Sequence, residues 1–145
     1  MSDDCQVDFY VLAKGGQAAR QLACRLALMA WEQGHRVAMR TADSTQARVL
    51  DEMMWDYPPG RFLPHAVHGR ADNAPVSICV GDDGIGDDRD LVINLVENAV
   101  PEPRRFSRLL EIVPAEPGQR SASREKFRIY RDQGLKPSHH TIGKS

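Results

Sequence analysis

Short apolar runs of strand length alternate along this chain with longer stretches of helical periodicity. The runs at residues 7–12, 76–80 and 91–96 are rich in Val, Leu and Ile and end at turn-forming residues. Because residues 91–96 (LVINLV) are almost wholly apolar, we expect this strand to be buried on both faces in the middle of a sheet. Shorter strands are predicted at residues 37–40 and 109–113.

Three helices are predicted between these strands. Residues 17–33 place an apolar stripe on one side of a helix and end at a glycine, which commonly terminates helices. The second helix spans about residues 43–56, with Asp43 or Ser44 as its capping residue, and the last spans about residues 117–133. This alternation predicts an α/β layered domain with a mixed or largely parallel sheet flanked by helices.

A chain of 145 residues is long enough for one domain with a sizeable core. We expect this domain to span residues 1–136, because residues 137–145 (PSHHTIGKS) form a polar tail that should be at best partly ordered. The three cysteines, Cys5, Cys24 and Cys79, are far apart and lack the paired spacing of a zinc site. They are predicted to be free, buried thiols.

The charge balance limits the partners that the whole chain can attract. A formal net charge of -1 argues against strong general affinity for DNA or for an anionic membrane, so any contact with DNA should be indirect. No apolar run approaches the roughly 20 residues needed to span a bilayer. The N-terminus is acidic before its first apolar run, which is the wrong order for a signal peptide. We therefore expect a cytoplasmic location.

Motifs for nucleotide, metal or nucleophilic chemistry are weak. The turn after the first strand contains only Gly15-Gly16 and lacks the GxGxxG pattern, so the predicted fold is Rossmann-like without a nucleotide site. The acidic segment at residues 81–90 lacks the spacing of a calcium loop. We predict no catalytic residues, metal or cofactor. The alternative is a small nucleotide- or metal-dependent enzyme that uses this turn and this acidic segment.

An aromatic and proline-rich stretch at residues 50–65 (LDEMMWDYPPGRFLPH) is the most distinctive part of the sequence. Its first half continues the second helix, whereas consecutive prolines exclude a helix from its second half. Large apolar side chains, Trp55 and Phe62 among them, should therefore be presented by a helix end and a stiff loop. This favours a docking surface for another protein. The alternative is that these rings cap the domain core.

The last helix carries a basic face with an aromatic residue in it. Arg120, Arg124, Phe127 and Arg131 are spaced by four, three and four residues and so share one side of the helix. Guanidinium groups could bind carboxylates while an apolar hollow beside Val113 and Phe127 takes a side chain, which favours an acidic, aromatic peptide as ligand. The alternative is a solvated basic face whose aromatic residues turn to the core.

Five segments in a fixed order give the chain a resemblance to a known family. They are VDFYVL, WEQGHRV, LDEMMWDYPPGRFLPH, APVSI and REKFRIYRDQG. Together they cover nearly the whole chain, which resembles the chi subunit of the bacterial DNA polymerase III holoenzyme. The third segment is the most specific of the five.

The resemblance implies a non-catalytic adaptor in DNA replication. Proteins of this kind bind the psi subunit, which joins them to the clamp loader, and also the acidic C-terminal tail of the single-stranded-DNA-binding protein. A DNA-repair helicase can use the psi-type surface in some members. The DNA-directed DNA polymerase activity of the complex belongs to another subunit.

The same resemblance assigns residues to two separate sites. The psi or helicase site would comprise Trp55, Phe62, Pro64 and His65. The site for the tail of the single-stranded-DNA-binding protein would comprise Val113, Arg120, Arg124 and Phe127.

Overall fold

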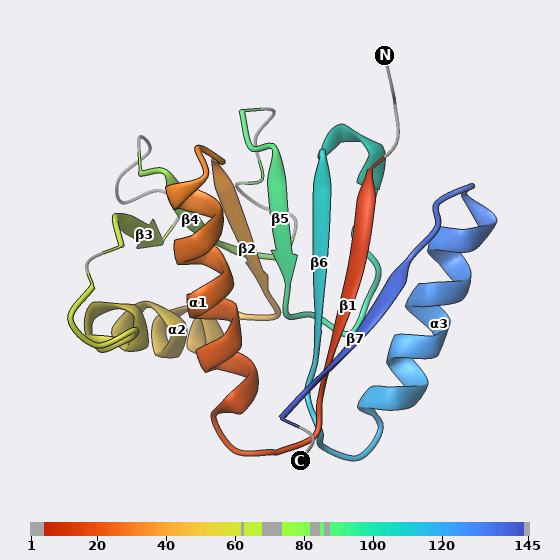
Figure 1. The fold of residues 1–145 in the computed structure, drawn as a ribbon, viewed down its shortest axis with the longest axis horizontal. Coiled ribbons are helices and arrows are strands. Elements are labelled where there is room, and N and C mark those ends of the chain that lie inside the picture. Colours follow the sequence, from red (N-terminus) through yellow and green to blue (C-terminus); the bar gives the residue numbers. More distant parts are fainter. Residues whose placement is uncertain (1–4, 62, 68–73, 82–84, 86–87, 144–145) are drawn as a thin grey trace.

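A single parallel sheet organises the computed structural model, which describes residues 5–61, 63–67, 74–81, 85 and 88–143. Within this part of the chain the sheet contains seven strands in the order β3-β4-β2-β5-β6-β1-β7 (Figure 1). The predicted α/β class is therefore confirmed, and the described strand pairs are all parallel.

The elements follow one another along the chain with short connections. The strands are β1 (Gln6–Leu12), β2 (Val37–Thr41), β3 (His65–Val67), β4 (Val76–Val80), β5 (Leu91–Asn94), β6 (Arg108–Val113) and β7 (Ser138–Ile142). The helices are α1 (Ala18–Glu32), α2 (Ser44–Asp56) and α3 (Gln119–Asp132), with a short 3-10 turn, η1, at Pro103–Arg105.

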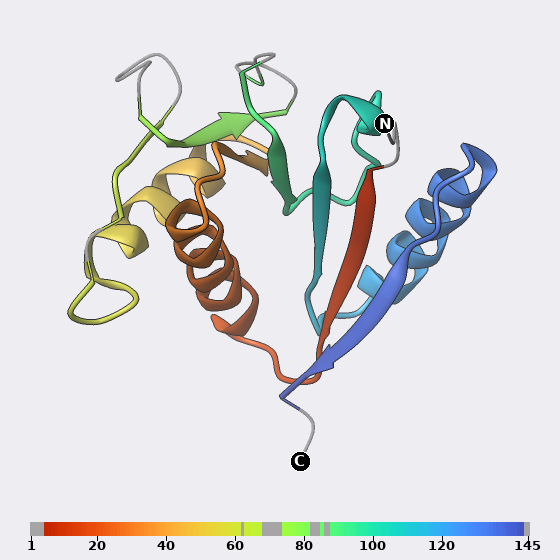
Figure 2. The same cartoon turned by 45° about the horizontal axis from the view of Figure 1, so that its top comes forward.

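Helices cover both faces of the sheet. The apolar sides of α1 and α2 pack on a cluster that includes Met39, Ile78 and Ile93, whereas Tyr130 of α3 packs on the opposite face against Phe9. Figures 1 and 2 show α1 and α2 over the part of the sheet near β2, and α3 beside β1 and β7 at the other end. The described residues of the two predicted sites therefore lie toward different ends of the sheet.

Local chemistry explains where several elements begin and end. The Asp43 side chain accepts a hydrogen bond from the Gln46 amide at 2.8 Å and caps α2, as predicted. The strand predicted over residues 91–96 ends instead at Asn94, whose side-chain oxygen accepts from the Val96 amide at 3.1 Å and turns the chain. The short strand β3 is not predicted by the sequence pattern.

Strand β7 overturns the expectation of a poorly ordered tail. Ser138–Ile142 pairs in parallel with Asp8–Leu12 of β1 and forms an edge of the sheet. The prediction failed because this segment is polar, whereas an edge strand needs no continuous apolar run when its exposed side faces water. Its histidines point to opposite faces: His139 stacks on Phe127, and His140 bonds Asp8.

A buried carboxylate links β7 to the rest of the sheet. Asp8 is 3% exposed and accepts hydrogen bonds from Arg108 and from the His140 ring, each at 3.0 Å. Burial alone would raise the pKa of Asp8, but these hydrogen bonds and the nearby guanidinium outweigh it and hold the pKa below its ordinary value of 3.8.

A depressed pKa makes stability depend on pH in a defined direction. Because the folded state holds Asp8 ionised more strongly than the unfolded state, its contribution is present above pH 3.8 and is lost as the pH falls through the lower folded pKa. We therefore expect the free energy of unfolding in urea to decline more steeply below about pH 4 in the wild type than in Asp8→Asn. Parallel pH profiles for the two proteins would contradict this role.

The three cysteines are buried and free, as predicted. Burial raises the pKa of Cys5 to about 11 and that of Cys24 to about 12, so these thiols stay protonated at neutral pH. Within the described ranges, no helix combines the length and the apolar composition that crossing a bilayer requires.

Candidate functional site

Helix α3 divides its side chains between the core and a groove at the sheet edge. Ser123, Lys126 and Tyr130 are buried, whereas Arg120 and Arg124 are exposed and Phe127 is half-buried. This division follows from helical spacing, because residues three or four positions apart share a face. Tyr130 turns to the core as the alternative interpretation held, whereas Phe127 packs against Phe9 of the core and also lines the groove.

Two adjoining hollows form what we call the α3–β7 groove. The first, of about 540 Å³, is lined by Val11, Val113, Arg120 and Arg124, together with His139 and neighbouring residues. The second, of about 460 Å³, lies beside Phe127, Arg128 and Arg131. Ser123, Arg124 and His139 line both hollows. The structure therefore brings Val113, Arg120, Arg124 and Phe127, which come from β6 and α3, to one continuous surface.

Positive charge dominates this groove. Arg128 forms ion pairs with Glu125 and, at 3.8 Å, with Asp132 on the same helix. Among the described residues, no acidic side chain forms an ion pair with Arg120 or Arg124. These two guanidinium groups stand at the first hollow beside the apolar side chain of Val113. The groove can therefore accept a carboxylate next to an apolar group.

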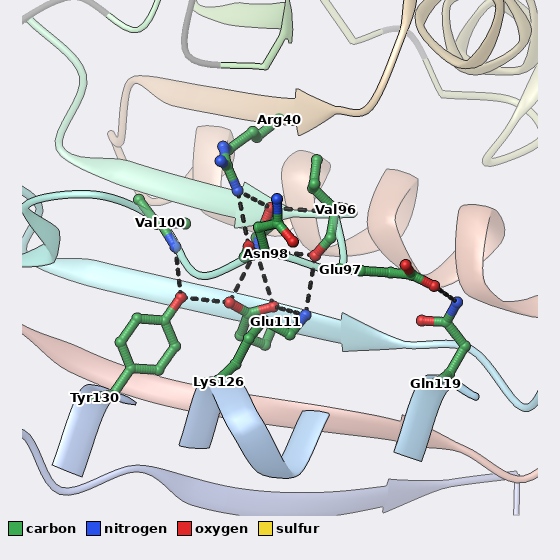
Figure 3. Close-up of polar contacts among 10 residues, drawn as sticks. Arg40, Val96, Glu97, Asn98, Val100, Glu111, Gln119, Lys126 and Tyr130 are labelled. Atoms are coloured by element: carbon green, nitrogen blue, oxygen red, sulfur yellow. Dashed lines mark hydrogen bonds and ion pairs between the residues drawn. The ribbon is translucent and has the colours of Figure 1, made fainter. Parts of the chain in front are cut away.

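A buried polar network holds α3 in place over the sheet (Figure 3). Glu111 of β6 is fully buried and accepts hydrogen bonds from Lys126 at 2.7 Å and from Tyr130 at 2.6 Å. Asn94 also donates to Glu111, and Arg40 donates to Asn94 at 3.1 Å. Arg40, Asn94 and Glu111 are register partners on neighbouring strands, so they form one row across the sheet.

The network also fixes the segment that follows β5. The Lys126 ammonium donates to the Val96 carbonyl at 3.0 Å, and Tyr130 accepts from the Val100 amide at 2.9 Å. Burial and the adjacent Glu111 raise the pKa of Tyr130, so its hydroxyl stays protonated and can donate. Two consecutive turns of α3 are thus anchored to the sheet, while Phe127 and Arg128 between them line the second hollow.

The second predicted surface lies at the end of α2. Trp55 is 60% exposed, although it is one of the largest apolar side chains in the chain. Its ring lies 5.0 Å from that of His65, and the His65 side chain is only 1% exposed. His65 is held in turn by the Leu63 carbonyl at 2.7 Å and by Asp51. Trp55 therefore stands outward on a fixed support.

The other two residues predicted for this surface have different positions. Pro64 is half-buried beside His65, whereas Phe62 lies outside the described residues. Because the His65 side chain is enclosed, it can support Trp55 but offers little area of its own to a partner. Trp55 is thus the side chain of this group that a partner could cover.

Two groups of site residues were missed by sequence reasoning. His139 was missed because its segment was predicted to be a tail. Glu111 and Lys126 were missed although the sequence carries a signal, since Glu111 is the charged residue in the apolar run LLEIV. A carboxylate in the middle of a buried strand requires a partner from another element.

Residues suited to metal chemistry do not gather in the described part of the chain. No group of three His, Cys, Asp or Glu side chains there could hold a metal ion. Part of the acidic segment, including Asp82, Asp83 and Asp87, lies outside the described residues. The described geometry instead presents a cationic groove and an exposed aromatic side chain.

Comparison with known proteins places this chain close to one family. The family model described as DNA polymerase III chi subunit, HolC, matches residues 5–138. A DNA polymerase III subunit chi from Pseudomonas aeruginosa is 41% identical over 138 residues, which is 94% of this chain and 96% of that relative. The subunit chi of Escherichia coli is 32% identical over 134 residues, covering 88% of this chain and 91% of that relative.

A solved structure shares the fold but little sequence. The C-terminal domain of Dbp5 from S. cerevisiae, solved bound to Gle1 and IP6, superposes with a TM-score of 0.60 at 10% identity. The match covers 97% of this chain and 92% of that domain. At this identity the likeness concerns the arrangement of strands and helices alone.

Proposed function

This chain belongs to the DNA polymerase III chi subunit family, and from that premise we propose that it is a non-catalytic adaptor with two docking surfaces. The α3–β7 groove binds the acidic C-terminal tail of the single-stranded-DNA-binding protein. The Trp55 surface binds the psi subunit of the clamp loader. The chain thereby connects the replicative polymerase to single-stranded DNA without binding DNA strongly itself, and it works in the cytoplasm.

The observation that carries the tail assignment is the meeting of charge and apolar surface in one groove. Arg120 and Arg124 have no ion-pair partner among the described residues and stand beside Val113 in a hollow of about 540 Å³. A peptide that ends in an aromatic residue offers a ring and a terminal carboxylate together. The ring can fill the hollow while the carboxylate meets a guanidinium group, a charge-assisted contact.

Arg124 is the residue whose loss tests this assignment most directly, because it lines both hollows. We expect Arg124→Ala to weaken binding of an acidic, Phe-terminated peptide by roughly 1.5–3 kcal/mol, the range for a hydrogen bond to a charged group. Isothermal titration calorimetry gives the affinity. Arg48→Ala is the matched control, because Arg48 is an exposed arginine of α2, on the other face of the sheet. Equal affinities for wild type and Arg124→Ala would refute the tail site.

Salt should affect the two surfaces differently. Binding between exposed charges is screened at high ionic strength, with a Debye length of about 10 Å at 0.1 M. We therefore expect the affinity for the acidic peptide to fall as sodium chloride is raised, while binding through the apolar Trp55 surface changes little. Titrations of both partners at several salt concentrations compare them. A tail affinity independent of salt would contradict a cationic binding site.

The Trp55 surface also suits a second partner, because an exposed aromatic side chain on a rigid support can serve more than one protein. A DNA-repair helicase that uses the psi-type surface would then compete with psi.

The alternative function, a small nucleotide- or metal-dependent enzyme, is tested separately by measuring the thermal shift with ATP, NAD and magnesium. A saturable rise in melting temperature with one of these ligands would favour it over the adaptor.

A further inference from the structure

We propose that His139 is a binding residue of the α3–β7 groove and that its imidazole forms the wall against which a bound aromatic-acidic peptide is held. This inference rests on the proposed tail-binding function and extends the site to strand β7. It assigns β7 a part in the site as well as in the sheet.

The first observation is the position of His139 where the two hollows meet. Its side chain lines both the hollow beside Val113 and the hollow beside Phe127. Two other residues share this position, Ser123 and Arg124, and both belong to α3. At the junction of the hollows, His139 is therefore the residue that comes from the edge strand β7. A peptide long enough to enter both hollows must therefore lie alongside this ring.

The second observation is the stacking that fixes the ring. His139 lies nearly parallel to Phe127, with ring centroids 4.8 Å apart and planes inclined by 6°. Its centroid is also 5.5 Å from that of Phe9 on β1. These contacts hold the imidazole in one orientation, whereas the residue as a whole is exposed. A pre-positioned ring loses little conformational freedom when a ligand covers it.

The third observation is that His139 and the adjacent His140 make different contacts. Successive residues of a strand point to opposite faces, and His140 stacks on Tyr10 and bonds Asp8 instead. His140 lines neither hollow. The two adjacent histidines thus divide their tasks: His140 ties β7 to the sheet, and His139 faces the groove. This pair provides a matched control within one strand.

The test is calorimetric titration of an acidic, Phe-terminated peptide into wild type, His139→Ala, His139→Phe and His140→Ala. Stacked aromatic contacts contribute about 0.5–1.5 kcal/mol, so His139→Ala should weaken binding roughly 2- to 12-fold. His139→Phe keeps a stacking ring and should stay within about twofold of wild type. His140→Ala should lower the melting temperature but leave the affinity for the peptide close to that of wild type.

Each outcome bears on the proposal. Wild-type affinity in His139→Ala, with the peptide bound normally by wild type, would overturn the role of His139 and leave the tail site standing. Equal losses in His139→Ala and His140→Ala would show that β7 acts only as a scaffold, which also overturns it. Failure of wild type to bind the peptide would refute the tail site and this inference together. The proposal is supported if His139→Ala lowers the affinity for the peptide and His139→Phe retains it.

Discussion

Replacing Glu111 with alanine is expected to lower the free energy of unfolding by about 3–5 kcal/mol, the usual range when one partner of a buried ion pair is removed. The Lys126 side chain is 4% exposed, and its ammonium group would lose the carboxylate that lies 2.7 Å away. Tyr130 and Asn94 would lose the acceptor to which both donate. No water can replace these contacts without entering the space between α3 and the sheet.

A double-mutant cycle separates the ion pair from the rest of the network. Lys126→Met keeps the aliphatic stem and removes the charge, which leaves Glu111 buried without its cation. Combining it with Glu111→Gln retains an acceptor for Tyr130 and removes both charges. We expect the double variant to be more stable than the sum of the single losses predicts, because neither charge is then left unpaired.

Urea unfolding followed by far-UV circular dichroism measures these free energies. Glu125→Ala is the matched control, because Glu125 is an exposed glutamate of α3 that pairs with Arg128 on the same helix. Its loss should cost far less than the loss of Glu111, because exposed ion pairs contribute little to stability. If Glu111→Ala proved no more destabilising than Glu125→Ala, the network would not be what holds α3 to the sheet.

This network shows why the sequence predicts elements better than it predicts their contacts. The positions of β1, β4 and α2 followed from local patterns, since each apolar run or helical stripe is visible within a short window. The partner of Glu111 is not local, because Lys126 reaches it from the next element along the chain. A lone glutamate in an apolar strand indicates that a partner exists, but it does not identify the partner residue.

Strand β7 shows a second limit on what can be predicted from the sequence. Its pairing joins Ser138 to Asp8, residues from opposite ends of the described chain, and nothing in a polar segment encodes that register. The predicted basic face of α3 was visible from spacing alone. Its counterpart across the groove was not visible, because His139 contributes only once β7 has joined the sheet edge.

Replacing Trp55 with alanine is expected to weaken binding of the psi-type partner by about 2–4 kcal/mol, roughly 30-fold or more, as for an aromatic residue at the centre of an interface. Trp55 is 60% exposed, so it offers a partner a large side chain to cover. The enclosed His65 ring supports it at 5.0 Å and keeps it outward. Because the side chain is mainly outside the core, the variant should unfold at nearly the wild-type urea concentration.

Met29 on α1 provides the matched control, because it is the other large apolar side chain that is mostly exposed in the described chain, at 53%. Met29→Ala removes a similar kind of surface without touching the Trp55–His65 pair. Pull-down of a purified psi-type subunit, followed by calorimetry, compares the two variants. Peptide binding in the α3–β7 groove should remain unchanged in both, since the groove lies at the opposite end of the sheet.

The pattern of losses decides between a partner site and a merely exposed side chain. Loss of psi binding in Trp55→Ala alone, with peptide binding intact, is the result expected of an adaptor that holds two partners independently. Equal retention of psi by both variants would remove Trp55 from the interface. Simultaneous loss of both partners would mean that Trp55 acts on the fold, and the 60% exposure of the residue argues against that result.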